Sequence, residues 1–459
     1  MRNLPLVPQR LHIRARLGQR TAAFDYMQAI RDAAFRAVTE SVGKGASFSQ
    51  LSPEAFQALS RNVQRKEPGH PDIGKRELFA IAQSLAAPVV EFAFGINWDL
   101  YVWVLTDYAV QFDKLDLDGV GGVDGLREVV TQLHAAADVT RDLGGGLATG
   151  KASTTVLLQL LQKLYSVLIA PIEKWLPERE GAPLCIVPAG VLFEVPFAAL
   201  QGADGRAVLD RWSVFEVPTL HFFAVTPEEP GTSCVVAGDP APASAAEKEW
   251  GPIARLPFAR DEAQEVARLY GVKALIGTEA TKRQVEDLLN SAQVVHLAAH
   301  AILSSNRPFE SAIVLAATEK DDGLIRVRDI DAKTLRARLV VLSCCSTAGG
   351  TVTGDGVLSL CRGLLAAGAH TVIASLWAVA DESTSFTMID FHRRLIENPF
   401  ESTLAEIFRQ AQLATRAKYH SHSQWAPFVL WGWAHWIQNA EWSQANGSSL
   451  AKVSQANIR

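Results

Sequence analysis

The chain has 459 residues, of which 48% are hydrophobic and 20% are charged. This composition is typical of soluble globular proteins and excludes a disordered or collagen-like polymer, while the length favours two or three domains. The formal net charge of −5 gives no general electrostatic reason to bind nucleic acid directly. No uncharged apolar window reaches the ~18 residues that a membrane helix needs. Arginines interrupt residues 1–16, so we expect no signal peptide, no membrane segment and a cytoplasmic protein.

The cysteines bear on both redox state and metal binding. There are 5 of them, an odd number, and none shows CxxC spacing. The sequence therefore indicates neither a disulfide framework nor a zinc site. We expect reduced thiols and predict no metal and no other cofactor.

The first part of the chain divides into a helical and a mixed region. Residues 1–88 show helical periodicity, which predicts a small helical N-terminal region. Short β-branched and aromatic runs then alternate with two long helical patterns, which predicts an α/β region over 89–230. Its strands are expected at 89–94, 99–105, 108–113, 183–189 and 211–217, and its helices at 125–139 and 154–176.

A loop rich in Pro, Glu and Gly at 226–233 marks the next boundary, and strands and helices alternate over 231–440. This order predicts a mostly parallel sheet flanked by helices. The strands are expected at 234–238, 274–277, 294–299, 312–316, 339–343, 371–375 and 428–433, and the helices at 261–271, 282–289, 356–368, 382–397 and 403–418. The polar residues 441–459 are expected to form a mobile tail.

Two of these strands end in residues that could carry chemistry. His300 follows one strand, and Cys344 and Cys345 follow another. Functional groups gather beyond the carboxyl ends of parallel strands, and a thiol beside an imidazole suits acyl transfer. Strand alternation allows at most one of the adjacent cysteines to face the crevice. Free cysteines and single histidines are also often simply packed, so position alone leaves a structural role open.

Four segments follow one another in the second region: HLAAH at 296–300, LVVLSCCSTAGG at 339–350, the segment 354–381 that ends in SLWAVAD, and QWAPFVLWG at 424–432. Together and in this order they resemble the CHAT family of caspase- and separase-related cysteine proteases. Earlier segments at 99–112 and 183–200 are also similar, so the resemblance runs from about Val89 to Trp436.

The resemblance implies roles for individual residues. Cys345 matches the catalytic cysteine and His300 the catalytic histidine, while Cys344 is expected to be buried packing. Asp381 matches a loop that lines the substrate pocket in separase-like relatives and would favour Arg or Lys there, although a role as helix cap is equally expected. Ala301 stands where relatives commonly have glycine; its backbone N–H could serve as an oxyanion donor, whereas any need for a positive φ would cause strain.

The resemblance implies a caspase-like cysteine endopeptidase that cleaves a protein substrate, as a regulated effector in a bacterial signalling or defence system. The 89–230 region would be a pseudo-caspase-like half and 231–440 the catalytic half of the CHAT domain. The helical N-terminal region would receive an activating protein partner. The alternative is a catalytically weak CHAT scaffold that acts by protein–protein interaction. A serine α/β-hydrolase is disfavoured because no G-x-S-x-G motif occurs.

Overall fold

The computed structural model describes thirteen segments of the chain. They are residues 82–94, 98–142, 149–224, 230–241, 246–248, 252–289, 291–302, 310–331, 335–344, 351–353, 356–358, 360–397 and 402–434. Most of the predicted helical N-terminal region and the whole of the predicted tail at 441–459 lie outside these segments. Those two predictions therefore stay predictions.

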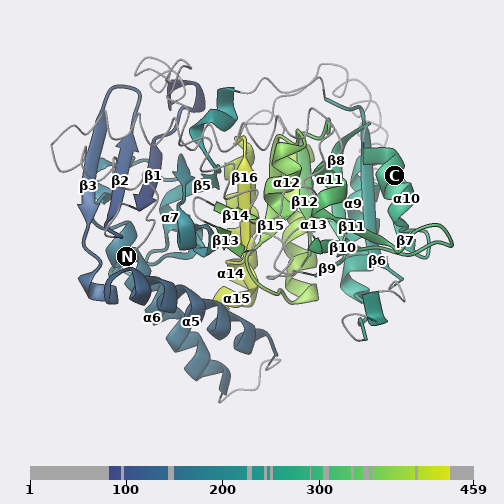
Figure 1. The fold of residues 1–459 in the computed structure, drawn as a ribbon, viewed down its shortest axis with the longest axis horizontal. Coiled ribbons are helices and arrows are strands. Elements are labelled where there is room, and N and C mark those ends of the chain that lie inside the picture. Colours follow the sequence, from purple (N-terminus) through teal and green to yellow (C-terminus); the bar gives the residue numbers. More distant parts are fainter. Residues whose placement is uncertain are drawn as a thin grey trace, which may run out of the picture.

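The main element is an 11-stranded sheet that runs across the whole described molecule (Figure 1). In spatial order its strands are β3 (Val110–Leu115), β2 (Leu100–Leu105), β1 (Val89–Phe94), β4 (Ala182–Val187), β5 (Trp212–Glu216), β16 (Phe428–Gly432), β15 (Thr371–Ser375), β12 (Leu339–Leu342), β8 (Ala292–Ala298), β6 (Ser233–Pro240) and β7 (Leu275–Gly277). Neighbouring strands are parallel except for the pairs β1–β2, β2–β3 and β15–β16. The predicted mostly parallel sheet is confirmed.

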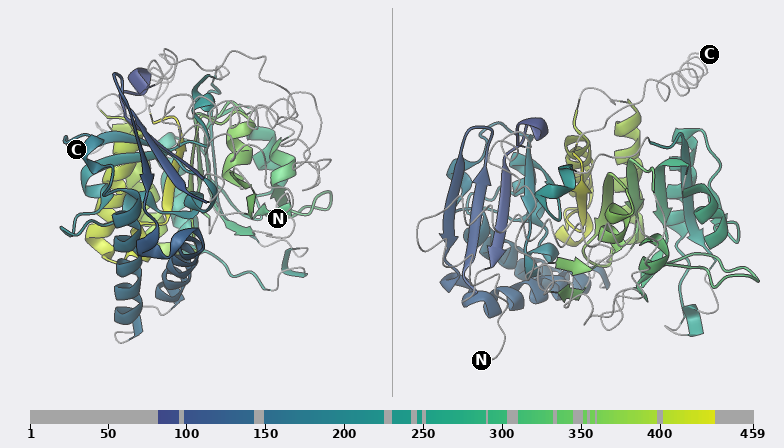
Figure 2. Two further views of the ribbon diagram at one scale, coloured as in Figure 1. Left: turned by 60° about the vertical axis from the view of Figure 1, so that its left-hand side comes forward. Right: turned by 45° about the horizontal axis from the view of Figure 1, so that its top comes forward.

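Helices cover both faces of this sheet (Figure 2). The described helices are α5 (Gly122–Asp142), α6 (Thr149–Leu168), α7 (Val208–Arg211), α9 (Pro257–Tyr270), α10 (Lys282–Leu289), α11 (Val327–Asp331), α12 (Leu360–Ala366), α13 (Asp381–Glu397), α14 (Leu404–Tyr419) and α15 (His422–Trp425). Helix α13 packs against α9 and against α14 on one face. Because crossovers between parallel strands are right-handed, α10, α11 and α12 lie on the opposite face.

Two small sheets accompany the large one. Strands β9 (His300–Ile302), β10 (Ala312–Val314) and β11 (Leu324–Arg326) form an antiparallel sheet directly after β8. Strands β13 (Thr351–Thr353) and β14 (Gly356–Leu358) form the other. The prediction of a helix over 356–368 is therefore wrong at its start, since α12 begins only at Leu360. The run Gly-Val-Leu is short and apolar, and such a run suits a strand as well as a helix.

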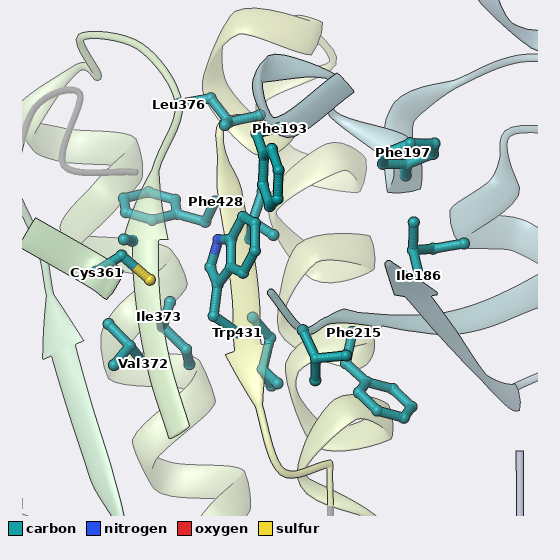
Figure 3. Packing of buried hydrophobic residues seen from close by; sticks show 14 of the residues in the cluster. Ile186, Phe193, Phe197, Phe215, Cys361, Val372, Ile373, Leu376, Phe428 and Trp431 are labelled. Atoms are coloured by element: carbon teal, nitrogen blue, oxygen red, sulfur yellow. The ribbon is translucent and has the colours of Figure 1, made fainter. Parts of the chain in front are cut away.

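The core is continuous between the two predicted halves. We call β1–β5 with their helices the first half, and β6–β16 with theirs the second half. Strand β16 of the second half pairs directly with β5 of the first. Phe193 of the first half stacks on Trp431 of the second, with ring centroids 5.6 Å apart (Figure 3). The two halves therefore share one sheet and one core.

Within the described segments, no helix combines the length and the apolar character that a membrane crossing requires.

Candidate active site

The candidate site lies where β8 and β12 end side by side. The two strands are parallel, and their last paired residues are Leu297 and Leu342. Beyond this pair the amide of Ser343 still donates to the carbonyl of Leu297 at 2.9 Å. Both strands are fully buried; β12 is a run of apolar residues, whereas β8 also contains Gln293 and His296. The chain thus leaves the sheet at neighbouring points on its way to His300 and toward Cys345.

His300 is the first residue of β9 and is partly exposed. Its Nε2 lies 2.7 Å from the carbonyl oxygen of Ala254, in the segment that precedes α9. A carbonyl oxygen only accepts hydrogen bonds, so Nε2 must carry the proton in this contact. In the neutral ring the lone pair is then on Nδ1. The imidazole is held in the tautomer that leaves Nδ1 free to accept a proton.

Cys345 lies outside the described residues, but its neighbour Cys344 is described and buried, as predicted. The thiol of Cys344 donates to the carbonyl of Leu297 at 3.3 Å. The carbonyl of Cys344 accepts from the hydroxyl of Ser375 on β15. The residue that precedes Cys345 is therefore fastened to the strands on both sides of β12.

The remaining described thiols are poor nucleophiles. Cys185 and Cys361 are buried, and Cys234 is only partly exposed. Burial raises the pKa of all three thiols, and nearby carboxylates add to the effect at Cys185 and Cys361. Because the thiolate is the reactive form, these side chains are held in their inert state.

Ala301 pairs with Ile313 in the small sheet. Its φ is not among the positive values found in the described backbone, so alanine causes no strain at this position. The departure from glycine thus costs nothing in backbone conformation. Whether the amide of Ala301 binds an oxyanion stays a prediction.

Asp381 is the first residue of α13, but it caps a different helix. Its Oδ2 accepts from the amide of Phe258 in the first turn of α9, at 2.9 Å. Burial raises the pKa of this carboxyl, an effect that the amides of Phe258 and Ala259 oppose and the carboxylate of Glu262 reinforces. The alternative prediction that Asp381 caps the helix that follows it is wrong, because Asp381 is itself the first residue of α13 and its carboxylate accepts from the first turn of α9 instead. One carboxylate oxygen is thereby occupied.

A chain of buried polar side chains, which the sequence analysis did not find, lies beneath β8. Glu262 of α9 approaches His296 Nε2 at 2.9 Å, His296 Nδ1 lies 3.1 Å from His392 Nε2 of α13, and His392 Nδ1 lies 2.9 Å from the Tyr270 hydroxyl. Glu262, His296 and His392 are all 0% exposed. The sequence gives no signal for this chain, because its members stand far apart: His392 is 96 residues from His296 and 122 from Tyr270.

The ionisation of this chain follows from its burial. Burial, together with the neighbouring His296, lowers the pKa of His392, so His392 is neutral at pH 7. Burial also raises the pKa of Tyr270. A consistent order of donation runs from the Tyr270 hydroxyl to His392 and from His392 to His296, which leaves His296 Nε2 facing Glu262. The chain joins α9, β8 and α13 and so fixes the strand that leads to His300.

The described residues contain no group of three or more His, Cys, Asp or Glu side chains that could hold a metal ion.

The candidate site thus places the imidazole of His300 after one strand, beside a second strand that leads to a thiol. A family model described as the CHAT domain matches residues 158–433, more than half of the chain.

The chain belongs to the CHAT domain family. The matched range begins within α6, so β1–β3, the whole of α5 and the first part of α6 precede it, although β1–β3 continue the same sheet. The resemblance expected from about Val89 onward is thus shown only from residue 158.

Two curated relatives and one solved structure are similar to this CHAT domain protein. Tetratricopeptide repeat protein 28 is 30% identical in Mus musculus and 29% identical in Homo sapiens, over 326 residues that cover 59% of this chain. This match covers only 13% of the relatives' own length. A chain of the Saccharomyces cerevisiae separase–securin complex has a TM-score of 0.53 at 10% identity, covering 84% of this chain and 32% of that one. The last similarity establishes a shared fold.

Proposed function

We propose that this CHAT domain protein is a caspase-like cysteine endopeptidase in which Cys345 is the nucleophile and His300 is the general base. The observation that carries the proposal is the hydrogen bond between His300 Nε2 and the carbonyl of Ala254. It leaves Nδ1 to accept the thiol proton. Two sequence positions support the pairing: His300 comes three residues after Leu297, and Cys345 three after Leu342, in two strands paired at those residues.

The proposed reaction is acyl transfer to sulfur followed by hydrolysis. A free thiol has a pKa of about 8.5, and a base beside it raises the thiolate fraction at neutral pH. The Cys345 proton passes to His300 Nδ1 while the sulfur bonds to the peptide carbonyl carbon. The C–N bond then breaks, and the imidazolium returns the proton to the leaving amine. Water, deprotonated by His300, hydrolyses the thioester, and the proton returns to sulfur.

The substrate proposed is a protein, recognised in part by a carboxylate. The Asp381 carboxylate accepts from the amide of Phe258 through Oδ2 and is also held by the amide of Ala259. Its charge would favour Arg or Lys before the cleaved bond, and the backbone N–H of Ala301 would stabilise the oxyanion. In the part of the chain that the structure describes, the thiols are buried or only partly exposed, which supports Cys345, outside that part, as the attacking group.

Regulation by a protein partner forms part of the proposal. The similar separase structure is a complex with securin, and the curated relatives are named for tetratricopeptide repeats. We infer that residues 1–88 receive an activating partner and that the peptidase is an effector in bacterial signalling or defence. The alternative is a catalytically weak scaffold, which Ala301 had favoured; the negative φ of this residue removes one reason for it.

The test is covalent labelling with a peptidyl acyloxymethyl ketone that carries Arg next to the reactive group. Labelling of the parent, Cys345→Ala, Cys344→Ala and His300→Ala proteins is followed by mass spectrometry. We expect the parent and Cys344→Ala to be labelled at residue 345, and the other two to remain unlabelled. Loss of labelling in Cys344→Ala alone would show that the nucleophile is misassigned. An unlabelled parent would favour the scaffold.

A further inference from the structure

A buried carboxylate holds the segment that carries the Ala254 carbonyl. Asp239 stands at the carboxyl end of β6, directly after Gly238, which pairs with Ala298 at the end of β8. Its side chain is only 4% exposed. Asp239 therefore lies beside β8, the strand that leads to His300, although it is far from the HLAAH motif in sequence.

Asp239 contacts the two residues that follow Ala254 and, in addition, Arg260 of α9. Its carboxylate accepts from Arg255 Nε at 2.8 Å and from Arg255 Nη2, and from the amide of Leu256 at 3.0 Å. Arg260 also donates to this carboxylate, through Nε at 3.1 Å and through Nη2 at 3.0 Å. A further bond at 3.1 Å joins Arg255 Nη2 to the Asp239 carbonyl. The two residues that follow Ala254 are therefore both tied to one carboxylate.

The electrostatics make this attachment strong. Burial would raise the pKa of Asp239, but the hydrogen bonds from Arg255, Leu256 and Arg260 outweigh it and lower the pKa. Asp239 is thus a carboxylate at neutral pH. Charge-assisted bonds to guanidinium groups are about twice as strong as neutral ones and also fix direction. The backbone of Asp239 has a φ of 44°, a conformation that Asp and Asn tolerate better than other side chains.

We propose that Asp239 and Arg255 are positioning residues for the endopeptidase reaction, because they hold the Ala254 carbonyl in place and so keep the proton of His300 on Nε2. The inference rests on the proposed function of His300 as the base. If the carbonyl moved away, the neutral imidazole would lose the contact that distinguishes its two nitrogens. Nδ1 would then carry the proton in part of the molecules and could not accept one from a thiol.

The expected kinetic effect is moderate and specific. Neither side chain touches a substrate, so the probe concentration that half-saturates the reaction should stay unchanged. The maximum labelling rate should fall by about 10- to 100-fold, the effect of a small misplacement of a catalytic group. A merely structural role would not change the tautomer of His300 in a protein that remains folded.

The experiment measures that tautomer directly in the full chain. Histidine labelled with 15N in the imidazole is incorporated, and long-range 1H–15N spectra are recorded; a His300→Gln protein assigns the His300 signals. The variants are Asp239→Asn, which preserves shape, and Arg255→Gln, whose side chain is 48% exposed in the parent and is expected to leave folding intact. The control is Glu265→Gln, which breaks an exposed pair with Arg268 on the same helix.

We expect the Nε2–H tautomer in the parent and in Glu265→Gln, and a mixture of tautomers in both other variants. A pure Nε2–H tautomer in folded Arg255→Gln would overturn the proposal, whatever happens to Asp239→Asn. The spectra need no peptidase activity. If the tautomer shifts although the parent never reacts with the peptidyl probe, the proposed function fails while the positioning of His300 stands.

Discussion

The two halves of the sheet bury ionisable groups of different kinds. In the first half, Glu91 and Glu216 lie fully buried on β1 and β5. Neither oxygen of Glu216 has a hydrogen-bond partner in the described part of the chain. In the second half, His296 and His392 are equally buried and are joined by a hydrogen bond, while Glu262 approaches His296 Nε2 at 2.9 Å without hydrogen-bond geometry. One half thus contains an isolated carboxyl, and the other a connected chain of imidazoles.

The buried groups of the two halves also lie at different places in the shared sheet. The isolated carboxyl of Glu216 sits where β5 meets β16, inside the joint between the halves. The connected chain lies under β8, the strand that leads to His300. Polar contacts also tie α14 of the second half to the first, among them the pairing of Arg416 with Asp210. The first half extends the sheet, and the candidate chemistry lies at strand ends in the second.

Breaking the buried chain of the second half should have the largest effect on stability. We expect Glu262→Ala to lower the free energy of unfolding by about 2–4 kcal/mol, because it leaves His296 buried without its carboxylate. Urea unfolding at pH 7.5 measures the change.

Glu265→Ala on the same helix is the matched control, since Glu265 pairs with Arg268 at the surface. Exposed pairs contribute at most about 1 kcal/mol. Equal losses in the two variants would show that the buried chain has no special role.

The buried carboxyl of Glu216 in the first half should make the stability of the protein depend on pH. Burial raises the pKa of Glu216 well above its usual value. Between the unfolded and folded pKa values the folded state binds the extra proton, so the parent loses stability as pH rises above about 4.5. We expect the stability of Glu216→Gln relative to the parent to increase from pH 5 to pH 8, by at most about 1.4 kcal/mol per pH unit. A flat difference would mean that the carboxyl is ionised without cost.

His370 of the second half should change stability with pH in the opposite direction to Glu216. Burial, with the nearby Arg338, lowers the pKa of His370 to about 4. The unfolded chain binds the extra proton below pH 6.5, so this residue costs stability as pH falls from 6.5 toward 4. We expect the stability of His370→Gln relative to the parent to increase as the pH falls through this range. Urea unfolding at pH 7 and pH 5 measures it, and a difference of the other sign would contradict the account.

Asp381 connects stability with specificity, and its effect should be the smallest. We expect Asp381→Ala to cost about 1 kcal/mol through loss of the cap on α9. We also expect it to reduce the preference for a probe with Arg over one with norleucine. Thermal unfolding and the two labelling rates measure the effects separately. An unchanged preference would reject the pocket role, and an unchanged stability would reject the capping role.

The strands of the large sheet were largely predictable because they are buried apolar runs bounded by polar breaks. The predictions for 89–94 and 371–375 coincide with β1 and β15. Short strands with mixed composition escaped this signal. The strands Leu324–Arg326 and His300–Ile302 form because each pairs with β10 in the small sheet. The short apolar run at 356–358 is compatible with either a helix or a strand. In the folded protein it forms a strand.

The candidate site was predictable as side chains but not as a hydrogen-bond network. His300 stands out because it follows a strand in a recognisable motif. The Ala254 carbonyl that fixes its tautomer is a backbone atom, for which no residue type gives a signal. His392 lies 96 residues from His296, and the periodicity of a helix does not distinguish a buried histidine from an exposed one.

The reactivity of Cys345 toward iodoacetamide as a function of pH tests the central claim most directly. It needs neither a substrate nor a partner, and mass spectrometry identifies the alkylated residue. We predict that Cys345 reacts fastest of the five cysteines at pH 7, with an apparent thiol pKa below about 8.5 that rises in His300→Ala. A Cys345 that reacts no faster than Cys234, or whose pH profile is the same in His300→Ala, would contradict the account.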